Sequence, residues 1–487
     1  MALCGSPQPG ESQFLTRGPG LRRAFNLGLV TGIVYFTGTL YWITRVMVVY
    51  GGLQTWVAVL VNAAMIVCLA LHIAVFALIV RRAVAAQGPF AIVAAPVVWV
   101  ATELTRTNMP HIGFPWVLLG YSQASVLPIA QLASVFGVYG VSMLVASASA
   151  ALAAIAVGTW PPRGRRYLPA AVVVVLVIGV ASWGRARLAA SEWTRVGEPV
   201  RVGLIQGNVD QAVKWDAAHA ASIFQDHVRL TEQALASGAE FVLWPESSMP
   251  FLFEENPIDA EKIRALARAH KVPILFGSDQ IEWRDVNGRR VLDKLYNAAF
   301  LVRPDGSTAG VYRKIHLVPF GEYVPLKRFL FFAAPLVEAV SDFSPGEKAE
   351  LLPVGPHRVS TAICYEIVYP ELVRRFVVAG SELLTTITND AWFGATSAPY
   401  QHFAQASMRA IEEGRYLVRS ANTGISGIVD PYGRVLAQTR IFEPAVVVGS
   451  VRYLQTSTFY ARHGDLIAYA SAAIALALLL VPQRRVQ

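Results

Sequence analysis

The stretch Ser360-Thr361-Ala362-Ile363-Cys364-Tyr365-Glu366 decides the expected fold. It predicts a β-strand that ends at Cys364, and a helix-like run from Tyr369 to Ala379 follows. A cysteine at a strand-to-helix turn lies on an exposed elbow, where backbone N–H groups can face a developing oxyanion. From this stretch alone, the alternative that Cys364 is a small buried hydrophobic residue stays open.

Two upstream stretches add charged side chains at the ends of predicted strands. They are Trp244-Pro245-Glu246-Ser247 and Tyr312-Arg313-Lys314-Ile315-His316. Glutamate, lysine and cysteine in that order form a possible general base, electrophile and nucleophile. A dry pocket that raises the pKa of the glutamate would suit it as the base. When each residue is considered alone, two alternatives stay open. Glu246 could be a surface carboxylate, and Lys314 could be a solvated lysine at the end of a strand.

The composition indicates a membrane protein with a polar region. The chain has 487 residues, of which 54% are hydrophobic and only 15% charged, and the mean hydropathy is +0.43. The net charge is +9, but the basic residues cluster at the ends of apolar segments, which favours membrane topology over nucleic-acid binding. Cys364 is the only thiol of the polar region, so no disulfide framework is possible there. No His/Cys cluster has metal-ligand spacing, so we expect no metal.

Six apolar segments are near the roughly 20 residues that are needed to cross a membrane. Four Arg clusters fall on the same side of the membrane, which predicts that both termini are cytoplasmic. They lie before the first segment, after the second, between the fourth and fifth, and after the last. The fourth segment is too long for one upright span. The segments are 26–48, 55–80, 89–105, 126–157, 167–183 and 466–482.

These segments divide the chain into a membrane part and one polar domain, which the charges place on the outer face. The first 20 residues lack the apolar core of a signal peptide. The predicted parts are a polar tail at 1–20, transmembrane helices at 21–184, a catalytic domain at 185–464, and a transmembrane helix with a basic tail at 465–487.

The polar domain alternates predicted strands with helical patterns, which indicates an α/β layered fold. Hairpin turns are expected at Asp305-Gly306 and Pro431-Tyr432-Gly433. Helices are expected at about 217–237, 258–270, 369–379 and 401–414. Strands are expected at Val200–Gln206, Phe241–Trp244, Val272–Phe276, Tyr296–Val302, Val311–Ile315, Arg358–Cys364, Leu383–Thr388, Tyr416–Ser420, Ser426–Asp430 and Val446–Val451.

One segment, 326–340, does not fit a soluble domain. Lys327 and Arg328 stand beside Phe331 and Phe332, as in interfacial segments with cations at headgroups and aromatic rings among acyl chains. The segment predicts a mobile lid that touches lipid. An ordinary core helix is the alternative.

Three stretches of the polar domain resemble the nitrilase (carbon–nitrogen hydrolase) superfamily: Trp-Pro-Glu-Ser at 244–247, Arg-Lys-Ile-His-Leu-Val-Pro-Phe-Gly-Glu-Tyr-Val-Pro at 313–325 and Ala-Ile-Cys-Tyr-Glu at 362–366. The resemblance implies an αββα sandwich and a catalytic triad of Glu246, Lys314 and Cys364. The chain is more similar still to the membrane-bound branch, the apolipoprotein N-acyltransferases. That similarity extends over residues 102–106, 113–116, 120–123, 206–208, 214–216, 389–394 and 401–403.

The resemblance implies a two-step acyl transfer in the bacterial inner membrane, with the catalytic domain on the periplasmic side. An acyl chain passes from a phospholipid to the cysteine as a thioester. The α-amine of the N-terminal diacylglyceryl-cysteine of an apolipoprotein then takes it up. No metal or soluble cofactor is implied. A membrane-tethered amidase that uses water, and a catalytically silent binding module, are the alternatives.

The resemblance also implies supporting residues. Glu322 would hold the triad lysine charged and in place, and the backbone N–H of Tyr365 would serve the oxyanion hole. Glu366 would either hydrogen-bond to the site or order the elbow. Trp215 and Trp392 would line the acyl or headgroup path, with core packing as the alternative.

Two expectations concern the membrane part. The Phe114-Pro115-Trp116 loop is expected on the outer side below the catalytic domain, with a plain interfacial anchor as the alternative. The similar family usually has eight spans, whereas six are expected here, and the missing pair would precede residue 20. Losing a pair of spans preserves the orientation of the catalytic domain.

Overall fold

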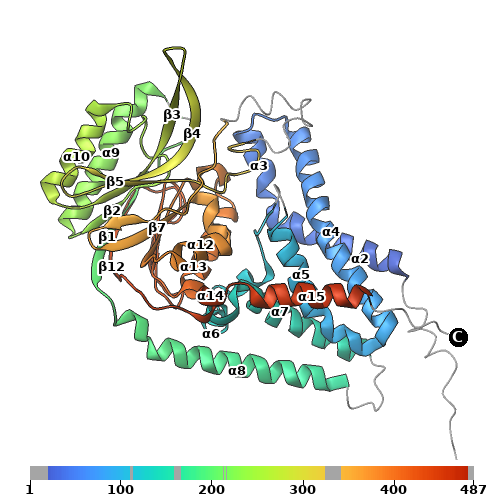
Figure 1. The fold of residues 1–487 in the computed structure, drawn as a ribbon. Helices are drawn as coiled ribbons and strands as arrows, with labels where there is room; N and C mark the ends of the chain where they lie inside the picture. Colours follow the sequence, from blue (N-terminus) through green and yellow to red (C-terminus); the bar gives the residue numbers. More distant parts are fainter. Residues whose placement is uncertain are drawn as a thin grey trace, which may run out of the picture.

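The computed structural model of the chain describes residues 20–109, 113–157, 166–211, 213–214, 216–323 and 342–480. A bundle of apolar helices lies on one side of the molecule and an α/β domain on the other (Figure 1). The predicted lid at 326–340 and Trp215 lie outside the described residues.

The apolar helices largely follow the predicted spans. Among the described residues, four helices are long and apolar enough to cross a membrane, or five if a pair bent by 54° is one span. The sixth predicted span corresponds to a helix of 15 residues that reaches residue 480, where the described part ends. The bundle consists of α2 (Leu21–Leu40), α3 (Trp42–Val49), α4 (Thr55–Gln87), η1 (Pro89–Ala94), α5 (Ala95–Thr107), α7 (Ala133–Val157), α8 (Leu168–Ala190) and α15 (Leu466–Leu480).

The segment that was predicted to be too long for one span is divided. A short helix, α6 (Leu127–Ala130), precedes α7, and α7 is kinked at Gly137. Gly137 has φ 64°, and a Cβ there would come within 2.4 Å of the Tyr460 ring on α14 (Phe459–His463). Only glycine suits both the backbone conformation and the close approach. The kink therefore lets α7 pack against the chain that leaves the α/β domain.

The α/β domain contains two six-stranded sheets. The first sheet has the strand order β12-β1-β2-β3-β4-β5, and the second has the order β11-β10-β9-β8-β7-β6. In each sheet three strands run parallel, β1-β2-β3 and β7-β8-β9, and the outer strands are antiparallel. The strands are β1 (Pro199–Gln206), β2 (Phe241–Leu243), β3 (Ile274–Val286), β4 (Arg289–Val302), β5 (Thr308–Arg313), β6 (Leu352–Val354), β7 (His357–Ile363), β8 (Leu383–Thr388), β9 (Leu417–Ala421), β10 (Gly427–Val429), β11 (Val435–Gln438) and β12 (Ala445–Arg452).

Both faces of the sheets are buried, which explains the continuous apolar runs of the parallel strands. Leu204 on β1 joins a core shared with Ile363 and Ile387 of the second sheet. Its neighbour Ile205 points to the opposite face and packs with Phe224 of α9 (Ala217–Ala236) and α10 (Pro257–His270). Burying each such side chain contributes about 2 kcal/mol. Successive residues of a strand thus pack on opposite faces of the sheet, so each sheet needs a helical layer over its outer face.

The second helical layer completes the expected αββα sandwich. It consists of α12 (Pro370–Val378) and α13 (Ala398–Glu413), and both contribute to the core of the second sheet. The second sheet lies between the first sheet and the apolar bundle (Figure 1). The face of the sandwich nearest the bundle is therefore the one formed by α12 and α13.

Three details of the predicted strands are wrong. β3 and β4 form a much longer hairpin than predicted, whose exposed outer half turns at Asn287 and Gly288. Both residues have positive φ, as the Asn-Gly pair favours in two-residue hairpin turns. β6 and β11 were not predicted, because they are short edge strands of three and four residues.

The turns at 305–306 and 431–433 are confirmed between β4 and β5 and between β10 and β11.

Candidate active site

Glu246 and Lys314 meet at one edge of the first sheet, although β3 and β4 lie between the strands that carry them. Glu246 follows β2 and Lys314 follows β5. The Lys314 Nζ donates to Glu322 Oε1 at 2.8 Å and to Glu246 Oε1 at 3.4 Å. Lys314 is only 1% exposed and Glu246 only 6% exposed. The alternatives of a solvated lysine and a surface carboxylate are therefore wrong.

Two asparagines hold the acidic side chains, and the sequence analysis did not single them out. Asn297 on β4 donates through Nδ2 to Glu246 Oε1 and to Glu322 Oε1, both at 2.8 Å. The backbone N–H of Asn389, just after β8, donates to Glu246 Oε2 at 2.8 Å. A polar residue within the apolar strand Tyr296–Val302 was the available signal, because a buried amide needs partners.

Glu246 is ionised, which corrects the expectation of a raised pKa. Burial alone would raise the pKa of Glu246, but Lys314 and the hydrogen bond from Asn297 outweigh it and hold the pKa below its ordinary value. Burial would lower the pKa of Lys314, yet Glu322 and Glu246 together raise it above the ordinary value. The resting site therefore contains a carboxylate beside a permanently charged ammonium group.

Cys364 lies at the predicted strand-to-helix turn, but the prediction that this elbow is exposed is wrong, because Cys364 is only 6% exposed. β7 ends at Ile363, and the chain turns through a 3-10 segment, η6 (Cys364–Val368), before α12. Cys364 has φ 52°, in the left-handed region that a residue with a β-carbon seldom adopts. This backbone differs from that of a cysteine that only fills space in a strand. Such strained positions cluster at functional sites.

The Cys364 thiol, at the end of a strand of the second sheet, is close enough to Glu246 and Lys314 for both charges to shift its pKa. Burial raises the pKa of Cys364, Glu246 raises it further, and Lys314 opposes them. The resting thiol is therefore protonated, with a carboxylate near enough to act on it electrostatically. The structure thus brings the three predicted triad residues together from both sheets.

Glu366 orders the elbow. Its Oε2 accepts a hydrogen bond from the backbone N–H of Ile363 at 2.8 Å. Its Oε1 accepts from the backbone N–H groups of Ile315 at 2.6 Å and His316 at 3.1 Å, and from the Tyr312 hydroxyl at 2.8 Å. One buried carboxylate thus fixes the strand end before Cys364 and the turn after Lys314 together.

The membrane part reaches the elbow through Trp116. This side chain is 1% exposed, and its ring stacks on Tyr365 with centroids 6.2 Å apart and planes at 17°. Its Nε1 donates to Gln401 Oε1 at 2.8 Å, and the same oxygen accepts from Trp42 Nε1 at 3.2 Å. Gln401 Nε2 donates in turn to the Thr39 carbonyl at 3.0 Å. Trp116 is a buried joint between the two parts, so it does not fit the interfacial-anchor alternative.

Trp392 also lies at this junction. It is 39% exposed, and its ring meets that of Tyr50 edge to face with centroids 5.0 Å apart. The Tyr50 hydroxyl donates to the Ala391 carbonyl at 2.8 Å. This exposure argues against simple core packing, and a place for Trp392 on a substrate path stays a prediction.

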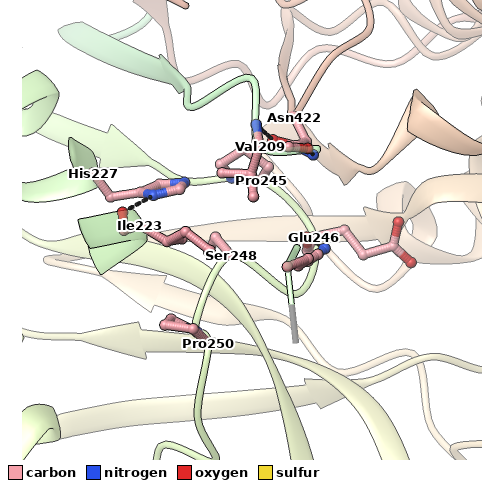
Figure 2. Close-up of a pocket in the computed structure, with 9 residues that line it drawn as sticks. Val209, Ile223, His227, Pro245, Glu246, Ser248, Pro250 and Asn422 are labelled. Carbon is pink, nitrogen blue, oxygen red and sulfur yellow. Dashed lines mark hydrogen bonds between the residues drawn. The ribbon is translucent and has the colours of Figure 1, made fainter. Parts of the chain in front are cut away.

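A small pocket lies behind Glu246 (Figure 2). The Glu246 carboxylate points away from His227, which donates from Nδ1 to the Ile223 carbonyl at 2.9 Å. The buried Lys214 Nζ donates to the Glu246 carbonyl at 3.2 Å. Burial lowers the pKa of Lys214 to about 8 although Glu246 opposes the shift. Lys214 is thus a second ammonium group near the triad, which the sequence analysis noted only as part of a similar stretch.

Comparison with known proteins gives the same assignment for both parts of the chain. The carbon–nitrogen hydrolase family matches residues 201–457, and the apolipoprotein N-acyltransferase N-terminal domain matches residues 13–151. The apolipoprotein N-acyltransferase of Geobacter metallireducens is 42% identical over 467 residues, which cover 95% of this chain and 88% of that protein. That of Methylococcus capsulatus is 33% identical over 473 residues, covering 94% of this chain and 87% of that protein. The chain therefore belongs to the apolipoprotein N-acyltransferase family, whose catalytic part is a carbon–nitrogen hydrolase domain.

Proposed function

We propose that this protein transfers a fatty acyl chain from a membrane phospholipid to the N-terminal α-amine of a diacylglyceryl apolipoprotein, through a thioester on Cys364. The observation that carries the proposal is the buried Glu246–Lys314 pair facing a cysteine on a strained elbow. Family membership supports the same reaction, because the relatives are named for it.

In the first step the thiol attacks the ester carbonyl of the phospholipid. As the S–C bond forms, the thiol proton passes to the Glu246 carboxylate, which acts as general base. The negative charge that develops on the carbonyl oxygen is stabilised by the Lys314 ammonium. The intermediate then expels the lysophospholipid alkoxide, which takes the proton from Glu246. The products are a thioester on Cys364 and a neutral leaving alcohol.

In the second step the lipoprotein amine attacks the thioester. The attacking nitrogen gives its proton to Glu246 as the C–N bond forms, and the sulfur leaves when the C–S bond breaks. The departing thiolate recovers the proton from Glu246, which restores the resting site. A two-step covalent route suits two bulky lipids, because they use one nucleophile in turn.

The membrane placement follows from the same reasoning. The chain is a membrane protein by its family and by its apolar helices. The distribution of Arg clusters supports a periplasmic catalytic domain in the bacterial inner membrane. Both substrates would then reach the elbow from the outer leaflet, beside the junction formed by Trp116 and Trp392. No metal or soluble cofactor takes part in the proposed steps.

The proposal is tested by incubating the full-length protein with phosphatidylethanolamine vesicles and analysing the Cys364 peptide by mass spectrometry. We expect an added acyl mass that hydroxylamine removes, and that a synthetic diacylglyceryl-cysteine peptide also removes by becoming N-acylated. Cys364→Ala should abolish both signals. Cys68→Ala is the matched control, because that free thiol lies on α4 in the apolar bundle.

Two outcomes would contradict the proposal. Undiminished N-acylation by Cys364→Ala would remove the thioester from the mechanism. Release of ammonia from small amides without any acyl-enzyme from phospholipid would favour the tethered amidase instead.

A further inference from the structure

A group of fully buried polar side chains lies behind the nucleophile elbow and has no part in the proposed proton transfers. His402, near the start of α13, is 0% exposed, and its Nε2 lies 3.1 Å from the carbonyl oxygen of Cys364. Its Nδ1 lies 3.0 Å from Asp390 Oδ1. The imidazole therefore bridges the backbone of the nucleophile and a buried carboxylate.

The direction of the first hydrogen bond is fixed by chemistry. A carbonyl oxygen can only accept, so Nε2 of His402 carries the hydrogen and donates to Cys364. This holds whichever protonation state the ring adopts at Nδ1. The Cys364 carbonyl thus has a donor of defined position within a rigid, solvent-free environment.

Arg419 and Asp390 hold the imidazole from its other side, and Arg419 Nη2 lies 3.0 Å from His402 Nδ1. Asp390 Oδ2 accepts from Arg419 Nη2 at 2.8 Å, and Asp390 Oδ1 accepts from the Thr388 hydroxyl at 2.9 Å. Burial alone would raise the pKa of Asp390, but Arg419 and His402 hold it well below its usual range. The network therefore runs from the carbonyl of the nucleophile through His402 to Asp390, which Arg419 and Thr388 hold in turn.

The bundle closes the remaining side of the imidazole. The Trp116 ring lies over His402 with centroids 5.3 Å apart. His402 follows Gln401, which accepts the indole N–H of Trp116. The histidine is thus held between the membrane part and Asp390, with little freedom to leave the Cys364 carbonyl.

Holding that carbonyl has a consequence for the next N–H group. A trans peptide unit is planar, so the C=O of Cys364 and the N–H of Tyr365 point in opposite directions from one rigid plane. A donor that fixes the oxygen therefore also aims the N–H. The Tyr365 N–H is the backbone donor next to the nucleophile, where it would join Lys314 at the oxyanion of the proposed reaction, and such donors act only when they are aimed in advance.

We propose that His402 is a positioning residue which, through its hydrogen bond to the Cys364 carbonyl, aims the Tyr365 N–H at the oxyanion of the acyl-transfer intermediates. This inference rests on the proposed cysteine acyl transfer. It assigns His402 no contact with the substrate and no proton of the reaction. Asp390, Arg419 and Thr388 hold the histidine in place.

The test uses two amide substitutions in the full-length protein. The side-chain amide of Gln reaches about as far as Nε2 of histidine, whereas that of Asn reaches about as far as Nδ1. His402→Gln should therefore keep a donor to Cys364, and His402→Asn should keep only the contact with Asp390. In both variants Asp390 keeps its hydrogen bonds from Arg419 and Thr388. Melting temperatures measured in detergent micelles show whether the variants are comparably folded.

Two rates and KM separate positioning from general damage. The acylation rate with phosphatidylethanolamine should fall about 100-fold in His402→Asn, the size expected for one oxyanion donor, and less than 10-fold in His402→Gln. KM should stay within about threefold. Alkylation of Cys364 by iodoacetamide should also stay within about threefold, because that substitution builds no oxyanion. His270→Gln, at the exposed end of α10, should behave as the unchanged protein.

The opposite results would overturn the inference. His402→Asn that acylates at the unchanged rate, or that loses alkylation and acylation equally, means that His402 does not aim the N–H. Equal losses in the Gln and Asn variants mean the same. An unchanged protein that forms no acyl-enzyme at all overturns the proposed function together with this inference.

Discussion

The two sheets of the sandwich contribute different things to one site. The first sheet supplies charge, since Glu246 and Lys314 stand at the ends of its strands and pair with each other. The second sheet supplies shape, since it presents Cys364 at a positive φ and fixes the turn through Glu366. The second sheet also faces the apolar bundle, whereas the first lies farther away (Figure 1).

This difference shows how one site can combine strong electrostatics with contact to lipid. Buried charges are costly unless they are paired, and the first sheet pairs Glu246 with Lys314. The elbow needs a precise backbone, and it obtains that from the hydrogen bond of the Ile363 N–H to Glu366. Substitutions in the first sheet should therefore change chemical rates, and substitutions in the second should change stability and positioning.

The largest effect is expected when the charge of the first sheet is removed. Lys314→Met keeps the length of the side chain but removes the ammonium group that faces the oxyanion. The rate of thioester formation should fall about 10³-fold, the upper end for loss of one oxyanion stabiliser. Mass spectrometry of the acyl-enzyme over time measures this rate.

Lys262→Met is the control for that experiment. Lys262 pairs with Asp259 on the exposed side of α10, where an ion pair contributes little. Rapid accumulation of acyl-enzyme in Lys314→Met would assign the stabilisation of the oxyanion to another group.

The next effect concerns acid stability and tests whether the helical layer outside the first sheet, which includes α9, is the pH-sensitive part. Burial, with a smaller contribution from Lys214, lowers the pKa of His227 to about 4. Between about pH 4 and the unfolded value of about 6.5, the unfolded chain binds more protons, so stability falls as the pH drops through this window. The full penalty is about 3 kcal/mol, and His227→Gln should remove that part of the slope.

Melting temperatures in detergent micelles from pH 7.5 to pH 4.5 measure this slope. His219→Gln, on an exposed face of the same helix, should leave it unchanged. An equal slope in His227→Gln and in the unchanged protein would place the acid-sensitive group elsewhere.

A smaller effect is expected in the second sheet. Glu366→Gln leaves one carbonyl oxygen where two carboxylate oxygens served four donors, so at least one buried N–H loses its acceptor. The free energy of unfolding should fall by about 2 kcal/mol. Alkylation of Cys364 by iodoacetamide should become faster, because the elbow opens more often.

Glu371→Gln on α12 is the control, because that carboxylate is half exposed and bonds only Arg374 among the described residues. If Glu366→Gln slowed acyl transfer without any loss of stability, Glu366 would act on the chemistry rather than on the shape of the elbow.

The smallest effect is expected at the joint with the bundle. Trp116→Phe keeps an aromatic ring on Tyr365 but loses the hydrogen bond to Gln401, which still accepts from Trp42. The expected loss is about 1 kcal/mol of stability. Trp56→Phe, an exposed tryptophan of the bundle, should cost less. A greater loss of activity than of stability would show that the joint also tunes the site.

The sequence allowed prediction of the triad because each member stands at the end of a strand with a distinct neighbouring motif. It did not reveal Asn297, and it gave Asn389 and His402 only as parts of similar stretches without a role, since these residues meet the triad only after strands far apart in the chain have paired. The prediction that the pKa of Glu246 is raised was wrong for the same reason. It depends on distances to Lys314 and Asn297, which no local pattern contains.

The αββα architecture was also predictable, because strand periodicity and alternating helices specify layers. The length of the β3–β4 hairpin was not, since its outer half is exposed and polar and lacks a continuous apolar pattern. Six spans were predicted from apolar length, whereas bending divides the first into α2 and α3. A break of this kind depends on what the helix packs against.

The Gln401 side-chain oxygen accepts from Trp42 and Trp116 of the membrane part, so the catalytic domain cannot be made soluble by deleting the apolar helices. Cutting away the helices would strip Gln401 of both indole donors and uncover the aromatic surface beside the nucleophile. An isolated hydrolase domain would then expose an apolar surface beside the nucleophile. Catalytic activity therefore depends on the membrane part of the same chain.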